Sequence, residues 1–315
     1  MVTPESDNEI DNIIWSEIES SDSHGDFVCY VVHSPYMAKY LESARARIDS
    51  GEYLDNLTPV RYLKAIERIE RLAETGDPAA TFHMGKIYAI GIAVQQNLPK
   101  AVEWYEKAIA LGEPRAHANL GWLYQSGYGV PTDKSRAFEL LSYGADNGVL
   151  SAKAAIGIML MNGEGCPRNP ELGLQKLEES FNSGYLNAGN HLSDIYFEGR
   201  LLPKNTELGH EWLMKVANCG DERSMAILGH YLVTGSHGKT DTGKGLALLV
   251  KATQLQYLPA YLWLGTLYKK GLGIEQDAEK AIEWFKMGIR AGCRDCQIAL
   301  NMMSLPDSDN PKSFH

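Results

Sequence analysis

The chain has no apolar run long enough to cross a membrane. A membrane-spanning helix needs about 20 consecutive apolar residues, and polar or charged residues interrupt every apolar stretch before that length. The first residues, MVTPESDNEIDN, contain neither a basic segment nor an apolar one, so the sequence shows no secretory signal. These absences predict a cytoplasmic protein without a membrane partner.

Cysteine is scarce and irregularly placed. The five cysteines are Cys29, Cys166, Cys219, Cys293 and Cys296, and an odd, scattered set is typical of reduced thiols. Cys293 and Cys296 form a Cys-x-x-Cys sequence, but a redox motif needs a βαβ setting and a zinc site needs two further ligands. We therefore interpret them as structural thiols.

Positive charge is absent from the N-terminal segment. No Lys or Arg precedes Lys39, whereas eight Asp and Glu residues do, so most of the net charge of −10 lies there. The balanced remainder lacks the basic stripe that nucleic-acid binding requires, and we predict no nucleic-acid partner. The acidic leader suits solubility or a basic partner. Its Ile10, Ile13, Ile14 and Ile18 share one helical face, which fits either a cap on the fold or a docking helix.

What the chain does contain is an internal repeat of 36 residues. Steps of 36 from Gly121 reach Gly85, Gly157, Ser193, Gly229 and Gly265. A second column, where a first helix would end in a left-handed turn, is always glycine: Gly91, Gly127, Gly163, Gly199, Gly235 and Gly271. Six residues later stands a residue that can cap a second helix: Asn97, Asp133, Asn169, Asn205, Asp241 or Asp277. This period predicts a solenoid of helix hairpins.

The second helix alternates small and bulky residues at helical spacing, as close helix packing requires. The small column is Ala101, Ala137, Gly173, Gly209, Gly245 and Ala281. The bulky column, four residues later, is Tyr105, Leu141, Leu177, Leu213, Leu249 and Phe285.

This pattern resembles the Sel1-like repeat family, whose helix hairpins are related to tetratricopeptide repeats. The matching residues are Leu120-Gly121-x-Leu123-Tyr124-x-x-Gly127-x-Gly129-Val130 and, one repeat earlier, Lys100-Ala101-Val102-Glu103-Trp104-Tyr105. The resemblance covers roughly residues 58–303 and implies an all-α, right-handed α-α superhelical solenoid. Ser193 departs from the family glycine, and Ala93, Leu201 and His237 depart from the second loop glycine, so those loops are expected to differ in shape.

The repeat also predicts the organisation of the chain. We expect an acidic leader or cap at 1–35, a degenerate zeroth repeat at 36–76 and six full repeats at 77–294. A half repeat at 295–303 closes the stack, and 304–315 form a tail. Terminal repeats of solenoids are commonly atypical because they lack one neighbour.

No catalytic arrangement is legible, and we predict no catalytic residue, metal or cofactor. Gly238-Lys239-Thr240 resembles the end of a phosphate-binding loop, but Val233 stands where the leading glycine belongs and no strand precedes it. His191, Asp194 and Glu198 share a helix face, and His230 occupies the column of Asp194 in the next repeat. They fit a metal site or, as we favour, a polar patch in a binding groove.

By resemblance to tetratricopeptide repeats, the first helix of each hairpin lines the concave surface. Trp122, Met161 and Phe197 are large apolar residues in positions that the repeat does not need for packing, and such residues are enriched at interface centres. The alternative is that they fill the interior of a narrow superhelix. We predict a partner-binding surface of Lys86, Trp122, Gln125, Ile158, Met161, Asp194, Phe197, Glu198 and His230.

The resemblance implies a non-enzymatic adaptor or scaffold that holds a protein or peptide in its concave groove. A sharper version is an immunity or inhibitor protein, in which the acidic leader occupies a basic site on a toxin or effector. A third hypothesis is β-lactam hydrolysis, which is linked to cysteine-rich relatives; the missing cysteine pairs and secretion signal count against it.

Overall fold

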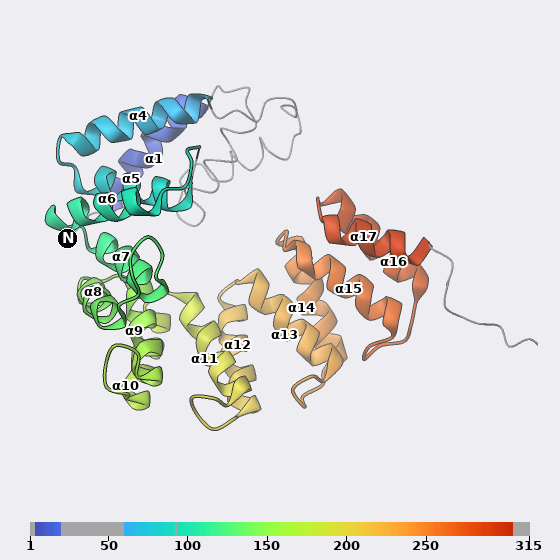
Figure 1. Cartoon of the computed structure of the whole chain (residues 1–315). Helices are drawn as coiled ribbons and strands as arrows, with labels where there is room; N and C mark the ends of the chain where they lie inside the picture. Colours follow the sequence, from blue (N-terminus) through green and yellow to red (C-terminus); the bar gives the residue numbers. More distant parts are fainter. Residues whose placement is uncertain (1–3, 20–59, 92, 305–315) are drawn as a thin grey trace, which may run out of the picture. The chain divides into compact units, whose positions relative to one another are not determined.

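The computed structural model describes residues 4–19, 60–91 and 93–304, and every regular element in these ranges is an α-helix (Figure 1). The all-α helical-repeat fold is therefore confirmed. The remaining parts of the predicted leader, zeroth repeat and tail lie outside the described residues. Within the described ranges, each helix is too short or too polar to span a bilayer.

The chain divides into two compact units, Met1–Lys176 and Leu177–His315, with the boundary inside α10 (Pro170–Asn182). Unit 1 contains α1 (Pro4–Ile18), α4 (Val60–Glu74), α5 (Pro78–Ile90), α6 (Leu98–Ala110), α7 (Pro114–Ser126), α8 (Lys134–Asp146) and α9 (Leu150–Asn162). Unit 2 contains α11 (Leu186–Glu198), α12 (Thr206–Asn218), α13 (Glu222–Thr234), α14 (Thr242–Gln254), α15 (Leu258–Lys270), α16 (Ala278–Arg290) and α17 (Arg294–Ser304).

Helix α1 covers the N-terminal end of unit 1. Ile10, Ile14 and Ile18 are almost fully buried in one hydrophobic cluster with α4 and α5. At the edge, Glu17 accepts a hydrogen bond from Arg68 Nη1 of α4 at 2.6 Å. The apolar face of α1 is thus occupied by the body of unit 1, which favours the cap interpretation over a docking helix.

Each hairpin loop is fastened at both ends, and the second hairpin of unit 1 shows how. α7 ends at Gly127, whose φ of 73° is left-handed and whose N–H donates to Leu123 O at 2.8 Å. Asp133 caps α8 by accepting from Arg136 N at 2.9 Å, and its own N–H donates to Tyr124 O at 2.9 Å. The latter bond, from the cap residue back to the first helix, recurs at Asn97, Asn169, Asn205, Asp241 and Asp277. It closes the loop whatever the residues in between.

Between the two helices, the glycine column permits close approach. At Gly121, a Cβ atom would lie 2.8 Å from Leu141 Cγ and 3.3 Å from Ala137 O of the second helix. In unit 2, Ser193 occupies this column and is buried, and its Oγ donates to Gly209 O at 3.0 Å. Ser193 is accommodated because Gly209 faces it on the second helix and accepts a hydrogen bond from its hydroxyl group.

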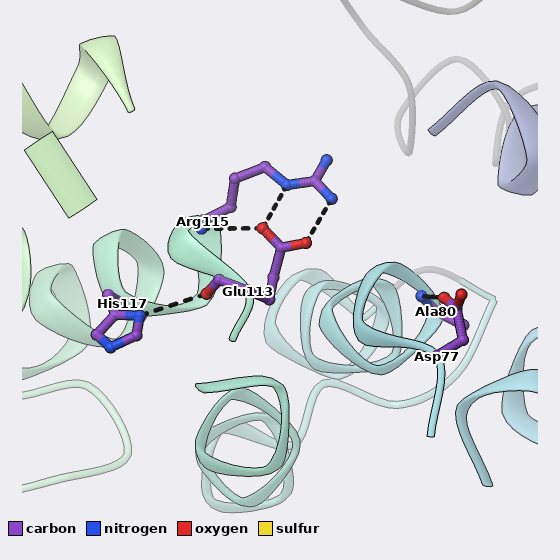
Figure 2. A network of polar contacts seen from close by, with 5 residues as sticks. All are labelled: Asp77, Ala80, Glu113, Arg115 and His117. Atoms are coloured by element: carbon purple, nitrogen blue, oxygen red, sulfur yellow. Dashed lines mark hydrogen bonds and ion pairs between the residues drawn. The ribbon is translucent and has the colours of Figure 1, made fainter. Parts of the chain in front are cut away.

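A buried ion pair lies at the start of α7 in unit 1 (Figure 2). Glu113, at the start of α7, is fully buried. Its carboxylate accepts from Arg115 N at 3.0 Å and from Arg115 Nε and Nη2, both at 2.8 Å. His117 Nδ1 lies 3.3 Å from Glu113 O, and its ring stacks on Tyr143 with centroids 4.0 Å apart. The carboxylate serves as helix cap and counter-ion at once.

The last helix closes the stack of unit 2. Cys296 of α17 is fully buried, and a Cβ atom on Gly288 of α16 would lie 2.5 Å from its Sγ. Burial and the neighbouring Cys293 raise the pKa of the Cys296 thiol. The Cys296 thiol therefore stays protonated at neutral pH, and both buried cysteines act as packing groups, in keeping with the structural interpretation.

Gly121→Ala should destabilise the fold, because the added methyl group must displace Leu141 or α8. We expect a loss of about 1–3 kcal/mol in the free energy of unfolding, measured by chemical denaturation. Gly243→Ala is the matched control: Gly243 lies in the first turn of α14, where a Cβ would meet only Asp241 Oδ1, 3.9 Å away. This control should be neutral or stabilising by about 0.5–1 kcal/mol.

Glu113→Gln should remove the charge from a fully buried site and leave the Arg115 guanidinium without its carboxylate. Breaking such a pair costs about 3–5 kcal/mol when it is fully buried; because Arg115 is a quarter exposed, we expect about 2–4 kcal/mol. Glu139→Gln, which breaks the exposed Arg136–Glu139 pair, should change stability by less than about 1 kcal/mol. Equal losses in the two variants would contradict a special role for Glu113.

Candidate protein-binding face

In unit 1, four predicted site residues lie half-exposed on first helices. Lys86 is on α5, Trp122 and Gln125 on α7, and Ile158 on α9. Trp122 flanks the hydrophobic cluster of α8 and α9, and Gln125 Nε2 donates to Glu164 Oε2 at 3.5 Å. Part of each of these side chains is thus available to a partner.

Met161 and Phe197 are buried, and their prediction as exposed groove residues is wrong. Met161 is fully buried and lies against Gly173 of α10, at the place where a Cβ of that glycine would be. Phe197 is 7% exposed, and its ring lies 2.7 Å from the Cβ position of Gly209 on α12. Both belong to the interior of their hairpins.

The physical reason is a compensation between two columns of the repeat. Where the second helix has glycine, the facing first-helix residue is large: Met161 opposite Gly173, Phe197 opposite Gly209 and Val233 opposite Gly245. Where the second helix has alanine, at positions 101, 137 and 281, the facing column of the first helix holds residues other than large apolar ones: Ala89, Gln125 and Lys269. The missing methyl group leaves space that a large side chain fills. This pairing was present in the sequence and could have identified both residues as interior.

Asp194, Glu198 and His230 remain at the surface of unit 2, together with two aromatic residues that the sequence reasoning did not select. Tyr231 of α13 and Trp263 of α15 are half-exposed. The His230 and Trp263 rings lie 5.5 Å apart, and the Phe197 and Tyr231 rings lie 5.5 Å apart. We call Asp194, Glu198, His230, Tyr231 and Trp263 the α11–α15 face.

The carboxyl group of Asp194 is electrostatically disfavoured in its ionised form. Partial desolvation raises its pKa above the usual 3.8, and the nearby Glu198 adds to the shift, while His191 and Arg223 oppose it. Burial raises the pKa of Tyr231, and the nearby Asp194 adds to this. Burial lowers the pKa of His230 and of His191. At neutral pH the face therefore presents carboxylates beside neutral rings.

This arrangement suits recognition of a cation. Aromatic faces and carboxylates both attract Lys or Arg side chains. Among the described residues, no three His, Cys, Asp or Glu side chains are grouped closely enough to hold a metal ion. His191, Asp194 and Glu198 are all exposed on α11, and the polar patch that we favour for them stays a prediction.

Comparison with known protein families matches six stretches of the chain to the Sel1 repeat: 78–113, 114–149, 150–175, 184–221, 223–257 and 258–293. Among curated proteins, the Sel1-repeat-containing protein YjcO of Escherichia coli K12 is 34% identical over 76 residues, or 23% of this chain. The match spans about one third (33%) of that relative.

Two solved structures share the fold. The Sel1 repeat protein from Oxalobacter formigenes is 25% identical with a TM-score of 0.56, and the match covers 72% of this chain and 99% of that one. A protective antigen present in uropathogenic Escherichia coli strains, which displays an SLR fold, is 26% identical with a TM-score of 0.55, covering 85% of this chain and 57% of that one. Because the family matches span well over half of the chain, this protein belongs to the Sel1 repeat family.

Proposed function

We propose that this protein is a non-enzymatic scaffold that binds a protein or peptide partner on its first-helix faces. Sel1 repeat proteins generally mediate protein–protein interaction. The observation that supports a specific site is the α11–α15 face, where half-exposed aromatic rings lie beside two exposed carboxylates. It fits a partner segment in which Lys or Arg is flanked by apolar residues.

Two features of this face go beyond what the fold needs. The packing of each hairpin is provided by the buried columns, so Trp263 and Tyr231 keep exposed aromatic surface that a partner can cover. Asp194 and Glu198 lie one helical turn apart and repel each other, and the charge of Glu198 accordingly raises the pKa of Asp194. A bound cation would relieve this repulsion, so charge and apolar contact act in the same direction.

An inhibitor of a basic toxin or effector is a special case of this proposal. Its partner would present Lys or Arg residues to the same carboxylates, and inhibition would follow if those residues lie in the partner's active site. The α11–α15 face, rather than the acidic leader, is the described surface that supports a basic partner.

Peptides selected on the purified protein should reveal this chemistry. We expect panning of a random peptide library to enrich sequences with Lys or Arg next to an aromatic or aliphatic residue. Binding of the selected peptides should weaken about tenfold in Asp194→Asn/Glu198→Gln, because an exposed ion pair contributes up to about 1 kcal/mol and this variant removes two of them. Fluorescence anisotropy with labelled peptides measures the affinity.

Glu207→Gln/Glu279→Gln is the matched control, since it removes the same charge from exposed positions on second helices. It should leave the affinity within about twofold, because distant surface charges are screened by salt. Enrichment of acidic peptides, or equal losses in the two double variants, would refute the proposed face. Unchanged circular dichroism of all variants excludes unfolding as the cause.

Asp194→Asn should stabilise the isolated protein at neutral pH while weakening partner binding. The raised pKa means that the folded state binds the proton more tightly than the unfolded state, so the charge reduces stability progressively as pH rises above the usual 3.8. The gain in Tm should therefore be present at pH 7 and vanish below pH 3.8. Asp277→Asn should act in the opposite direction, because the N–H of Lys280 and its ammonium lower the pKa of Asp277.

A further inference from the structure

One repeat of unit 2 departs from the pattern at three neighbouring places. His210 of α12 stands in a column whose other members are apolar: Val102, Phe138, Leu174, Leu246 and Ile282. In the loop after α13, His237 replaces the second loop glycine. The next position is Gly238, whereas other repeats have apolar residues there, such as Val94, Val130, Cys166 and Ile274.

In unit 1 the corresponding positions are filled by apolar side chains. Val102, Leu120, Tyr124 and Val130 pack together in one hydrophobic cluster. Their counterparts 108 residues later are His210, Leu228, Leu232 and Gly238. The loop thus loses a valine side chain, and a Cβ on Gly238 would meet nothing within 4 Å. The φ of 80° at Gly238 also moves the left-handed residue one place along the loop from its position at Gly129.

A pocket of about 440 Å³ lies at this place in unit 2. Its apolar lining is Met214, Leu228 and Leu232, and its polar lining includes His210 and three lysines, Lys215, Lys239 and Lys244. Pockets that hold small ligands are typically about 300–1,000 Å³ and combine an apolar wall with a few polar groups. The volume and the lining both match that description.

His210 is the polar group that the fold leaves unsatisfied. Its side chain is 5% exposed, and neither ring nitrogen has a hydrogen-bond partner. The rings of Phe197 and His237 lie 5.1 and 6.2 Å from it. Burial lowers the pKa of His210, and the charge of Lys239 adds to this, with a smaller opposing effect from the His237 backbone. The ring is neutral at pH 7, and its N–H can reach a ligand when the side chains that cover it move aside.

The charge around the pocket selects a monoanion. Two acidic residues, Glu211 and Asp241, also line it, so three lysines leave one net positive charge. The Asp241 carboxylate is already engaged, since it accepts from Lys244 N at 3.0 Å. Lys215 Nζ lies over the Trp212 ring at 3.8 Å. A dianion such as phosphate would exceed the available positive charge, whereas a carboxylate matches it.

We propose that this pocket, bounded by α12, α13 and the loop before α14, binds a carboxylate attached to an apolar group. The apolar group lies against Met214, Leu228 and Leu232, and the carboxylate accepts hydrogen bonds from His210 and the lysines. The carboxylate belongs either to a free small molecule or to a side chain of a peptide. This site shares no residue with the α11–α15 face and stands independently of the proposed function.

The test uses 4-phenylbutyrate and its neutral analogue 4-phenylbutanamide as probes of the full-length protein, with affinity measured by calorimetry. We expect saturable binding of 4-phenylbutyrate that shifts the His210 ring resonances in NMR spectra, and binding of the amide at least fivefold weaker. An acetylated peptide with one Asp after a Phe is the second arm. If this peptide binds more tightly than 4-phenylbutyrate, the carboxylate source is a peptide; if more weakly, it is a small molecule.

Two variants restore the repeat pattern and should weaken binding without harming the fold. His237→Gly/Gly238→Val recreates the Gly129-Val130 loop and fills the pocket. His210→Leu restores the apolar column and removes the unsatisfied ring, so it should raise Tm while weakening 4-phenylbutyrate at least fivefold. Lys269→Gln on α15, outside the pocket, is the charge control and should leave binding unchanged.

Three results would overturn the proposal: no saturable binding of either anionic probe, equal affinity for the acid and the amide, or full binding by the His237→Gly/Gly238→Val variant. Trp263→Ala, which alters only the α11–α15 face, should leave 4-phenylbutyrate binding unchanged. Failure of this site therefore leaves the proposed protein-binding function untouched, and the reverse also holds.

Discussion

The close approach of the two helices in each hairpin is the contact on which the rest of the structure depends. It requires almost no side chain in one column of the first helix, and it brings the second helix near enough for its bulky column to cover that glycine. Leu141 over Gly121 is one example, and Phe285 over Gly265 is another. Because every hairpin meets this requirement locally, an exception such as Ser193 needs only a local adjustment, here a hydrogen bond to Gly209 O.

The same proximity decides which residues remain for recognition. A glycine in the second helix opens space that the first helix must fill, so Met161 and Phe197 become interior residues although their columns vary in size. Surface chemistry is then left to positions that neither column uses. In unit 2 these carry Asp194, Glu198, His230 and Trp263, and their character is acidic and aromatic. The residues available to a partner are thus those that helix packing does not use. They can differ between repeats while the backbone stays the same.

Much of the fold could be predicted from the chain because its determinants are local and repeated. Glycine at a left-handed helix end, an Asn or Asp cap six residues later and alternating small and large residues each act within one hairpin. The site was less predictable because it depends on pairs of columns. Exposure of Phe197 depends on residue 209, and the joint position of Tyr231 and Trp263 depends on the stacking of α13 and α15. Glu113 was not predicted because its cap column is mixed. Asp77 and Asp221 also cap their helices there, whereas Val149 and Tyr185 make no side-chain cap, so the column does not identify a buried carboxylate.

The hydrogen bond from each cap residue back to its first helix has a further consequence. In the fifth repeat it joins Asp241 N to Leu232 O at 2.9 Å, as its counterparts do elsewhere, although the intervening residues differ from the pattern. A loop closed at its base in this way keeps both of its ends in place when its interior residues change. Such changes still need room, because the second loop glycine of other repeats lies against a helix, as Gly165 does against Lys134 O and Gly273 against Val233 O. A protein engineer could therefore vary residues 236–240 of this hairpin, whereas a His side chain placed at Gly165 would collide with α8.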